Sequence, residues 1–190
     1  MSYPTSPDFT AINIRSEHNV KKTETRSGRC IATTLGSQRW AFTAKYDDMT
    51  RAEFAPVFGF LMSTHGGVDT FDITPPIIND AQGDVSACTL AGLSSAGDAA
   101  ISVNITGTLK AGDFVKFSGH TKVYMVTEDR ASGSAVDLKI DPPLISSVIG
   151  GSSVTFDNIA FRVRMNNDVQ QVRLKEFDRY DFQVDFIEAI

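Results

Sequence analysis

The chain has 190 residues, of which 42% are hydrophobic and 22% are charged, and it carries a net charge of −5. These fractions are typical of soluble globular proteins, and they favour neither a disordered nor a fibrous chain. The acidic balance, without a cluster of Lys and Arg, argues against a nucleic-acid-binding protein.

The N-terminal residues 1–7 have neither the basic nor the apolar region of a signal peptide. No apolar run reaches the roughly 20 residues that a membrane-spanning helix requires. We therefore expect a soluble protein that is not secreted by the general route.

Alternating apolar residues predict half-buried strands in the first 46 residues. Ile12 and Ile14 alternate in the first of these strands. In a second strand, residues 38–46, the side chains of Trp40, Phe42 and Ala44 fall on one face. This face is expected to pack in the core.

A helix is predicted to follow at once, from about Asp48 to Thr64. Thr50 and Glu53 have the spacing of a capping box. An apolar stripe with helical periodicity comes next and predicts the face that packs on the strands; it consists of Phe54, Val57, Phe58 and Leu61. Pro56 predicts a kink or an irregular first turn, and Gly66-Gly67 predicts the end of the helix.

Residues 78–158 are rich in Gly, Ala and Ser and show short strands with almost no helical periodicity. One strand is predicted within residues 109–117, and a turn at Ser118-Gly119-His120 leads into a second at residues 122–127. A third is predicted at residues 135–140, and Pro142-Pro143 ends it. This segment is expected to form a small, barrel-like β domain.

Alternation resumes in residues 161–165, 172–174 and 180–187. The side chains of Tyr180, Phe182, Val184 and Phe186 share one face of the last strand. The sequence therefore predicts a mainly β fold. Residues 1–77 and 159–190 would form a discontinuous β-sandwich with one packed α-helix, and residues 78–158 a small β-barrel-like inserted domain.

Histidine and cysteine do not show the spacing of a metal or redox site. His18, His65 and His120 are far apart and lie beside turn residues, so we expect exposed loop histidines. Cys30 and Cys88 form no CxxC or CxxH pattern, and we expect two buried free thiols.

Paired carboxylates are explained by turns. Asp47-Asp48, Glu128-Asp129 and Glu176/Asp178 are near pairs, but each lies in an apparent turn, where loop solubility accounts for it. Asp178, Asp181 and Asp185 could form an acidic ledge for a divalent cation, although a solvated strand face is the stronger interpretation. We therefore assign no catalytic, cofactor-binding or metal-binding residue, and expect neither a cofactor nor an enzyme.

The order of strand, helix and inserted barrel resembles the distal tail (tail-tip or baseplate hub) proteins of tailed bacteriophages. The resemblance covers most of the chain. It is carried by Gly36–Tyr46, Met49–Pro56 and Phe58–Gly67, and in the insertion by Leu109–Phe114, Lys122–Val126 and Asp141–Leu144.

This resemblance implies a structural virion protein of the tail, made in the host cytoplasm. It implies a homo-oligomer, a hexameric ring, that connects the tail tube protein to the tail-tip hub proteins. DNA would pass transiently through the lumen of this ring. The negative net charge of the chain favours an acidic lumen, which would repel the DNA phosphates. An N-terminal arm with Pro4 and Pro7 would suit a segment that orders on assembly.

Two alternatives remain at this stage. The chain could be a head–tail connector or tube component, which would also be structural. It could instead be a carbohydrate-binding module of a tail, with Tyr124 or Trp40 as the stacking platform. Trp40 alternates in register with Phe42, which favours a core position for it over a platform.

Overall fold

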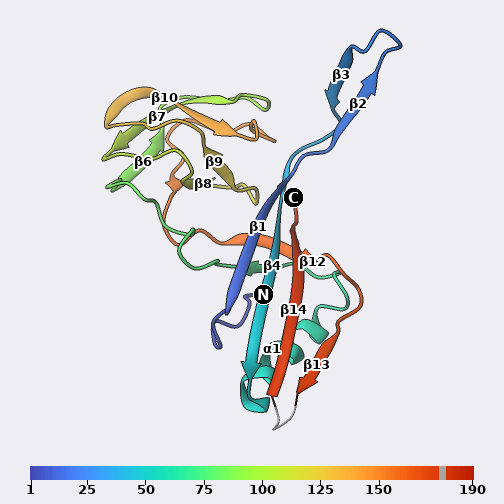
Figure 1. Ribbon diagram of the computed structural model, residues 1–190. Coiled ribbons are helices and arrows are strands. Elements are labelled where there is room, and N and C mark those ends of the chain that lie inside the picture. The colour runs from blue at the N-terminus through green and yellow to red at the C-terminus, as the bar shows by residue number, and fades with distance from the viewer. Residues whose placement is uncertain (176–178) are drawn as a thin grey trace. The chain divides into compact units, whose positions relative to one another are not determined.

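The computed structural model describes residues 1–175 and 179–190 (Figure 1). The chain divides into two compact units, the first made of Met1–Asp72 and Val163–Ala189, the second of Ile73–Arg162 with Ile190. The sequence predicted domain boundaries at 77/78 and 158/159, and these remain a prediction. The compact units divide at Asp72/Ile73 and Arg162/Val163.

A six-stranded sheet lies mainly in the first unit. Its order is β1-β4-β14-β12-β5, and β13 pairs with β14 beside this path. The strands are β1 (Ala11–Glu17), β4 (Arg39–Met49), β5 (Phe71–Ile73), β12 (Phe161–Met165), β13 (Val172–Lys175) and β14 (Arg179–Glu188). β4 and β14 run antiparallel at the centre of the sheet, as Figure 1 shows.

The central strands bury the face that the alternation predicted. Phe42 lies opposite Phe186, and Ala44 lies opposite Val184, so that apolar side chains of β4 and β14 meet on one side of the sheet. All four side chains are buried. Such cross-strand apolar pairs fix the register, because a shift of one residue would turn every one of them to the other face.

Helix α1 (Arg51–Ser63) packs its predicted stripe on this face. Phe54, Val57 and Leu61 are buried, and the rings of Phe54 and Phe182 meet edge to face with centroids 5.8 Å apart. The Glu53 carboxylate accepts hydrogen bonds of 2.8 Å from both the N–H and the hydroxyl of Thr50, as a capping residue does.

The helix is shorter than predicted, because residues 48 and 49 continue β4 and Thr50 is the N-cap. It is continuous α-helix through Pro56, so the irregular first turn is absent. It ends at Ser63, before Gly66-Gly67, as expected. In the described part of the chain, no helix has the length and apolarity to cross a membrane.

A separate two-stranded hairpin, which the sequence did not predict, joins β1 to β4. Its strands are β2 (Val20–Glu24) and β3 (Cys30–Thr34), and all ten of their residues are exposed. Figure 1 shows it extending beyond the ends of β1 and β4. A three-residue loop, Arg26-Ser27-Gly28, closes it, with Gly28 at a φ of 80° where the turn requires a left-handed residue.

The second unit contains a nearly closed, barrel-like sheet of order β11-β8-β9-β10-β7-β6. The strands are β6 (Ala87–Leu90), β7 (Ala100–Thr106), β8 (Phe114–Phe117), β9 (Tyr124–Val126), β10 (Gly133–Asp141) and β11 (Val154–Thr155). An antiparallel bridge between Thr89 and Ser153 brings β6 back to the β11 end. The Leu90 N–H also donates to the Ser152 carbonyl at 3.0 Å.

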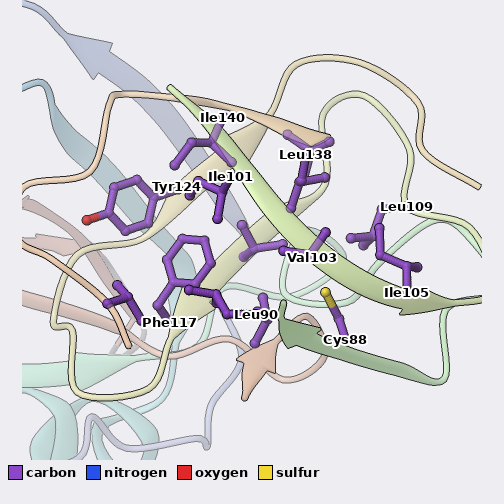
Figure 2. Packing of buried hydrophobic residues seen from close by; sticks show 14 of the residues in the cluster. Cys88, Leu90, Ile101, Val103, Ile105, Leu109, Phe117, Tyr124, Leu138 and Ile140 are labelled. Atoms are coloured by element: carbon purple, nitrogen blue, oxygen red, sulfur yellow. The ribbon is translucent and has the colours of Figure 1, made fainter. Parts of the chain in front are cut away.

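The barrel is filled by alternate side chains of its strands. On β7, Ile101, Val103 and Ile105 are buried while their sequence neighbours are not. Figure 2 shows these three packed with Leu138 and Ile140 of β10 and with side chains from the other strands. The predicted mainly β fold class is confirmed, with one packed helix and a small barrel-like sheet. Where the sequence predicted a β-sandwich, the described strands outside the barrel form one six-stranded sheet and the β2–β3 hairpin.

Candidate assembly surfaces

The described residues offer no ready metal centre. Within residues 1–175 and 179–190, no three His, Cys, Asp or Glu side chains gather in a way that could hold a metal ion. The carboxylate of Asp185 accepts a 2.6 Å hydrogen bond from the Thr43 hydroxyl, and that of Asp181 accepts one of 3.1 Å from the Asp48 N–H. Both carboxylates therefore bind the neighbouring strand β4. Asp178, the third member of the proposed ledge, lies with Glu176 outside the described residues.

The histidines differ from one another. His18 and His65 are exposed, as predicted. His120 is half-buried, and the prediction of an exposed histidine is wrong for it. Its Nδ1 lies 3.1 Å from the Tyr124 hydroxyl and its Nε2 lies 2.9 Å from the Ser146 hydroxyl. Burial lowers the pKa of His120. The two contacts of its ring tie the segment after β10 to β9.

Neither aromatic side chain proposed as a sugar platform is available to a ligand. Trp40 is 4% exposed and Tyr124 is 0% exposed. The Tyr124 ring packs edge to face on Phe117 in the barrel core, with centroids 5.3 Å apart. The platform predictions are therefore wrong, because a stacking platform must present a ring face to solvent.

The two thiols occupy opposite environments. Cys88 is buried in the barrel core, as predicted (Figure 2), and burial raises its pKa to about 11. Cys30 is exposed at the start of β3. The prediction of a second buried thiol is wrong, because Cys30 lies in the unpredicted hairpin, whose strand residues are all exposed.

The carboxylates of Glu128 and Asp129 form ion pairs with lysine and arginine side chains. Glu128 contacts Lys139 at 2.6 Å and Arg130 at 3.2 Å, and Asp129 contacts Lys110 at 2.9 Å. The hydrogen bond from Lys139 lowers the pKa of Glu128. The hydrogen bond from the Ala111 N–H makes the largest contribution to lowering the pKa of Asp129, and that from Lys110 the next largest. Both groups are thus held as carboxylates, whereas a glycosidase acid needs a raised pKa.

The other described pair, Asp47 and Asp48, differs from expectation in its structure. Both residues are part of β4, so the prediction that they lie in a turn is wrong. Asp48 has a φ of 58°, close to the point where β4 and β14 show a register irregularity. Their side chains are exposed at the end of the strand that leads into α1.

The N-terminal segment packs on the β5 edge of the sheet within the same chain. Ser2 forms a parallel bridge with Asp72 of β5, and the Tyr3 N–H donates to the Asp72 carbonyl at 2.9 Å. The Tyr3 ring is 5% exposed and packs in a cage of aromatic rings, formed by Phe9, Phe60, Phe71 and Phe186. The predicted arm that orders only on assembly is therefore wrong for Met1–Tyr3.

The two ends of the sheet in the first unit differ as binding surfaces. The N-terminal segment covers β5, whereas β1 has β4 as its only neighbouring strand among the described residues. A sheet edge without a second strand partner can pair with a strand of another chain. A groove of about 530 Å³ lies where the hairpin leaves β1 and β4, with Glu17, Leu35 and Ile187 among its lining residues.

The chain is similar in sequence to distal tail proteins of bacteriophages. Residues 79–159 match the family model described as "Distal tail protein pb9, B domain", and this match covers the barrel-like sheet. The chain is 24% identical over 163 residues to the distal tail protein pb9 of Escherichia phage T5. That alignment covers 84% of this chain and 80% of the T5 protein. The resemblance to phage distal tail proteins is confirmed, and the homology supports a structural protein of the virion tail.

Proposed function

We propose that the chain forms a homo-oligomeric ring, most simply a hexamer, at the tip of a bacteriophage tail, where it connects the tail tube protein to the tail-tip hub proteins. The observation that carries this proposal is the extent of the similarity to a distal tail protein, which covers 84% of the chain. An alignment of that length includes residues of both compact units. The proposed role is therefore that of the whole chain.

Open β surfaces support assembly. Strand β1 leaves one edge of its sheet without a strand partner among the described residues, and the β2–β3 hairpin is exposed throughout. A closed ring pairs every such surface with a neighbour, and it thereby removes the edges that would otherwise lead to aggregation. The ring accounts for surfaces that a free monomer would leave open.

Assembly, and not catalysis, is the proposed activity. The lowered pKa values of Glu128 and Asp129 suit surface ion pairs and not an acid catalyst. DNA would pass transiently through the ring, and the net charge of −5 favours an acidic lumen that repels phosphates. Synthesis in the host cytoplasm would keep the exposed thiol of Cys30 reduced.

Electron microscopy of intact virions tests this role. Phage particles that carry an epitope tag on this chain, labelled with a gold-conjugated antibody, should show gold at the distal end of the tail. Averaging of the tail tip should then resolve a ring with rotational symmetry at that position. Label at the head–tail junction would instead support a connector, and label along the whole tail would support a tube component; either result would reject the proposal.

A further inference from the structure

The β2–β3 hairpin combines exposed apolar side chains with a strong local charge. Val20, Ile31 and Leu35 expose 39%, 51% and 58% of their surface. The register places Lys22 opposite Ala32 and Thr23 opposite Ile31, so both faces of the ribbon mix charged or polar with apolar side chains. An isolated two-stranded ribbon of this kind is marginally stable in water. Contact with another surface would stabilise it.

The charge of the hairpin is opposite to that of the remaining chain. Between His18 and Gly36 lie four basic residues, Lys21, Lys22, Arg26 and Arg29, and one acidic residue, Glu24, which gives a net charge of +3. Since the whole chain carries −5, the remaining residues sum to −8. No ion pair of these basic side chains occurs within the described residues. Their charge is therefore available to a partner.

We infer that the hairpin docks on an acidic surface of a second copy of this chain, the neighbouring subunit of the ring. The inference rests on the proposed ring and names the segment that joins its subunits. Charge complementarity selects the partner, because a basic protrusion is attracted to a body that carries −8. The exposed Val20, Ile31 and Leu35 favour a protein surface over a phosphate backbone, since apolar area gains most by burial against other apolar groups.

The symmetry of such a contact also agrees with a ring. A hairpin that docks on a different surface of its neighbour makes a head-to-tail contact, and this type of contact generates closed rings when the rotation closes. A contact between two hairpins would instead be self-complementary and would stop at a dimer. Like charge opposes that dimer, because each hairpin carries +3.

Charge reversal tests the inference on the full chain. The variant K21E/K22E/R26E/R29E should weaken assembly at least about tenfold in sedimentation velocity, since attraction becomes repulsion. The matched control K21R/K22R/R26K/R29K keeps every charge and should assemble like the wild type. All four residues are exposed, so both variants should keep the wild-type circular dichroism and melting temperature. Added salt should weaken wild-type assembly by screening.

The outcomes separate this inference from the proposed function. If the wild type forms a ring and the reversed variant forms the same ring with equal affinity, the hairpin inference is rejected and the ring stands. If the wild type is monomeric at every concentration, the proposed ring itself fails. If the reversed variant assembles normally but loses affinity for a fluorescent duplex oligonucleotide that the wild type binds, the hairpin contacts nucleic acid and the inference is overturned.

Cys30 supplies a direct proximity measurement. It is exposed at the hairpin, whereas Cys88 is 3% exposed, so a maleimide photo-crosslinker should modify Cys30 selectively. Illumination of the assembled protein should give covalent dimers and higher species on a denaturing gel, and C30S should give none. Mass spectrometry should map the crosslinks to peptides outside residues 18–36 of the neighbour. Crosslinks that join only hairpin to hairpin would contradict the head-to-tail contact.

Discussion

The hydroxyl of Tyr46 donates a 3.0 Å hydrogen bond to the hydroxyl of Tyr3, and this bond joins the central strand β4 to the N-terminal segment. Burial raises the pKa of Tyr46 to about 12, and burial together with Tyr46 raises the pKa of Tyr3 well above its ordinary value. Both phenols therefore stay protonated at neutral pH. The bond fixes the segment that covers β5.

Removal of the Tyr3 ring should destabilise the first unit. Tyr3→Ala empties the aromatic cage and should lower the free energy of unfolding by about 3 kcal/mol. Tyr3→Phe keeps the ring and removes only the hydroxyl that accepts from Tyr46, so its cost should be about 1 kcal/mol. Urea unfolding monitored by circular dichroism measures both. Equal costs for the two variants would mean that the cage contributes nothing.

Only the buried face of α1 should contribute to the stability of the fold. Phe54 stacks on Tyr180 with ring centroids 4.9 Å apart and an interplanar angle of 7°. Phe54→Ala should therefore cost about 3 kcal/mol in urea unfolding. Met62→Ala, on the same helix but at a side chain that is 46% exposed, should change stability by less than about 0.5 kcal/mol. A large effect of Met62→Ala on the monomer would indicate that α1 packs differently.

Sequence periodicity located those parts of the fold in which one face is buried and the other is not. Three residues of the predicted stripe, Phe54, Val57 and Leu61, are buried, and the fourth, Phe58, is half-buried. The stripe and the alternation in β4 and β14 lie where predicted, because hydrophobic burial imposes the period of the helix or strand on the sequence. Ala41 is fully buried as well, although alternation placed it on the other face of β4. Ala41 lies between Arg15 of β1 and Ile187 of β14 in the sheet, and the sequence of one strand alone could not reveal these neighbours.

The β2–β3 hairpin escaped prediction because both of its faces are exposed, so the sequence shows no apolar alternation. The usable signals were its β-branched residues, such as Val20, Thr23 and Ile31, on either side of Ser27-Gly28. Because the hairpin was not predicted, Cys30 was wrongly predicted to be buried. His120 and Tyr124 were misplaced for a related reason, since their contacts with Ser146 and Phe117 depend on tertiary structure.

The two thiols should react at very different rates. A chromogenic thiol reagent should modify one thiol per native chain, at Cys30, and two per unfolded chain. Because burial raises the pKa of Cys88 from 9.0 to about 11, its thiolate is scarce and also shielded in the folded barrel. C30S should show no fast reaction. Two fast thiols in the native wild type would contradict the barrel core in Figure 2.

The same raised pKa predicts a loss of stability in alkali. A folded pKa above the unfolded one means that the folded chain binds the proton more tightly, so the stabilisation is fully present below pH 9.0 and is lost as the pH rises toward about 11. Across that range, the wild type should lose more stability than Cys88→Ala does. Parallel stability curves from urea unfolding at each pH would refute this assignment.

A glycine in the second unit should be irreplaceable for a steric reason. Gly107 has a φ of 95°, and a Cβ at this position would lie 2.3 Å from the carbonyl oxygen of Asp84. Gly107→Ala should therefore cost more than about 3 kcal/mol, since backbone must move. Gly119→Ala is the control, because its φ of 84° is similar but nothing lies within 4 Å of the added Cβ. That variant should cost about 1 kcal/mol in thermal unfolding, and equal costs would exclude the clash.

The most direct test of the proposed assembly is the mass of the purified chain in solution. Sedimentation equilibrium, repeated by native mass spectrometry, should find a species of six times the 20.7 kDa chain mass, in agreement with a closed hexameric ring. Images of the same sample should show particles with a central opening. A chain that stays at 20.7 kDa at every concentration and at low salt would contradict the account.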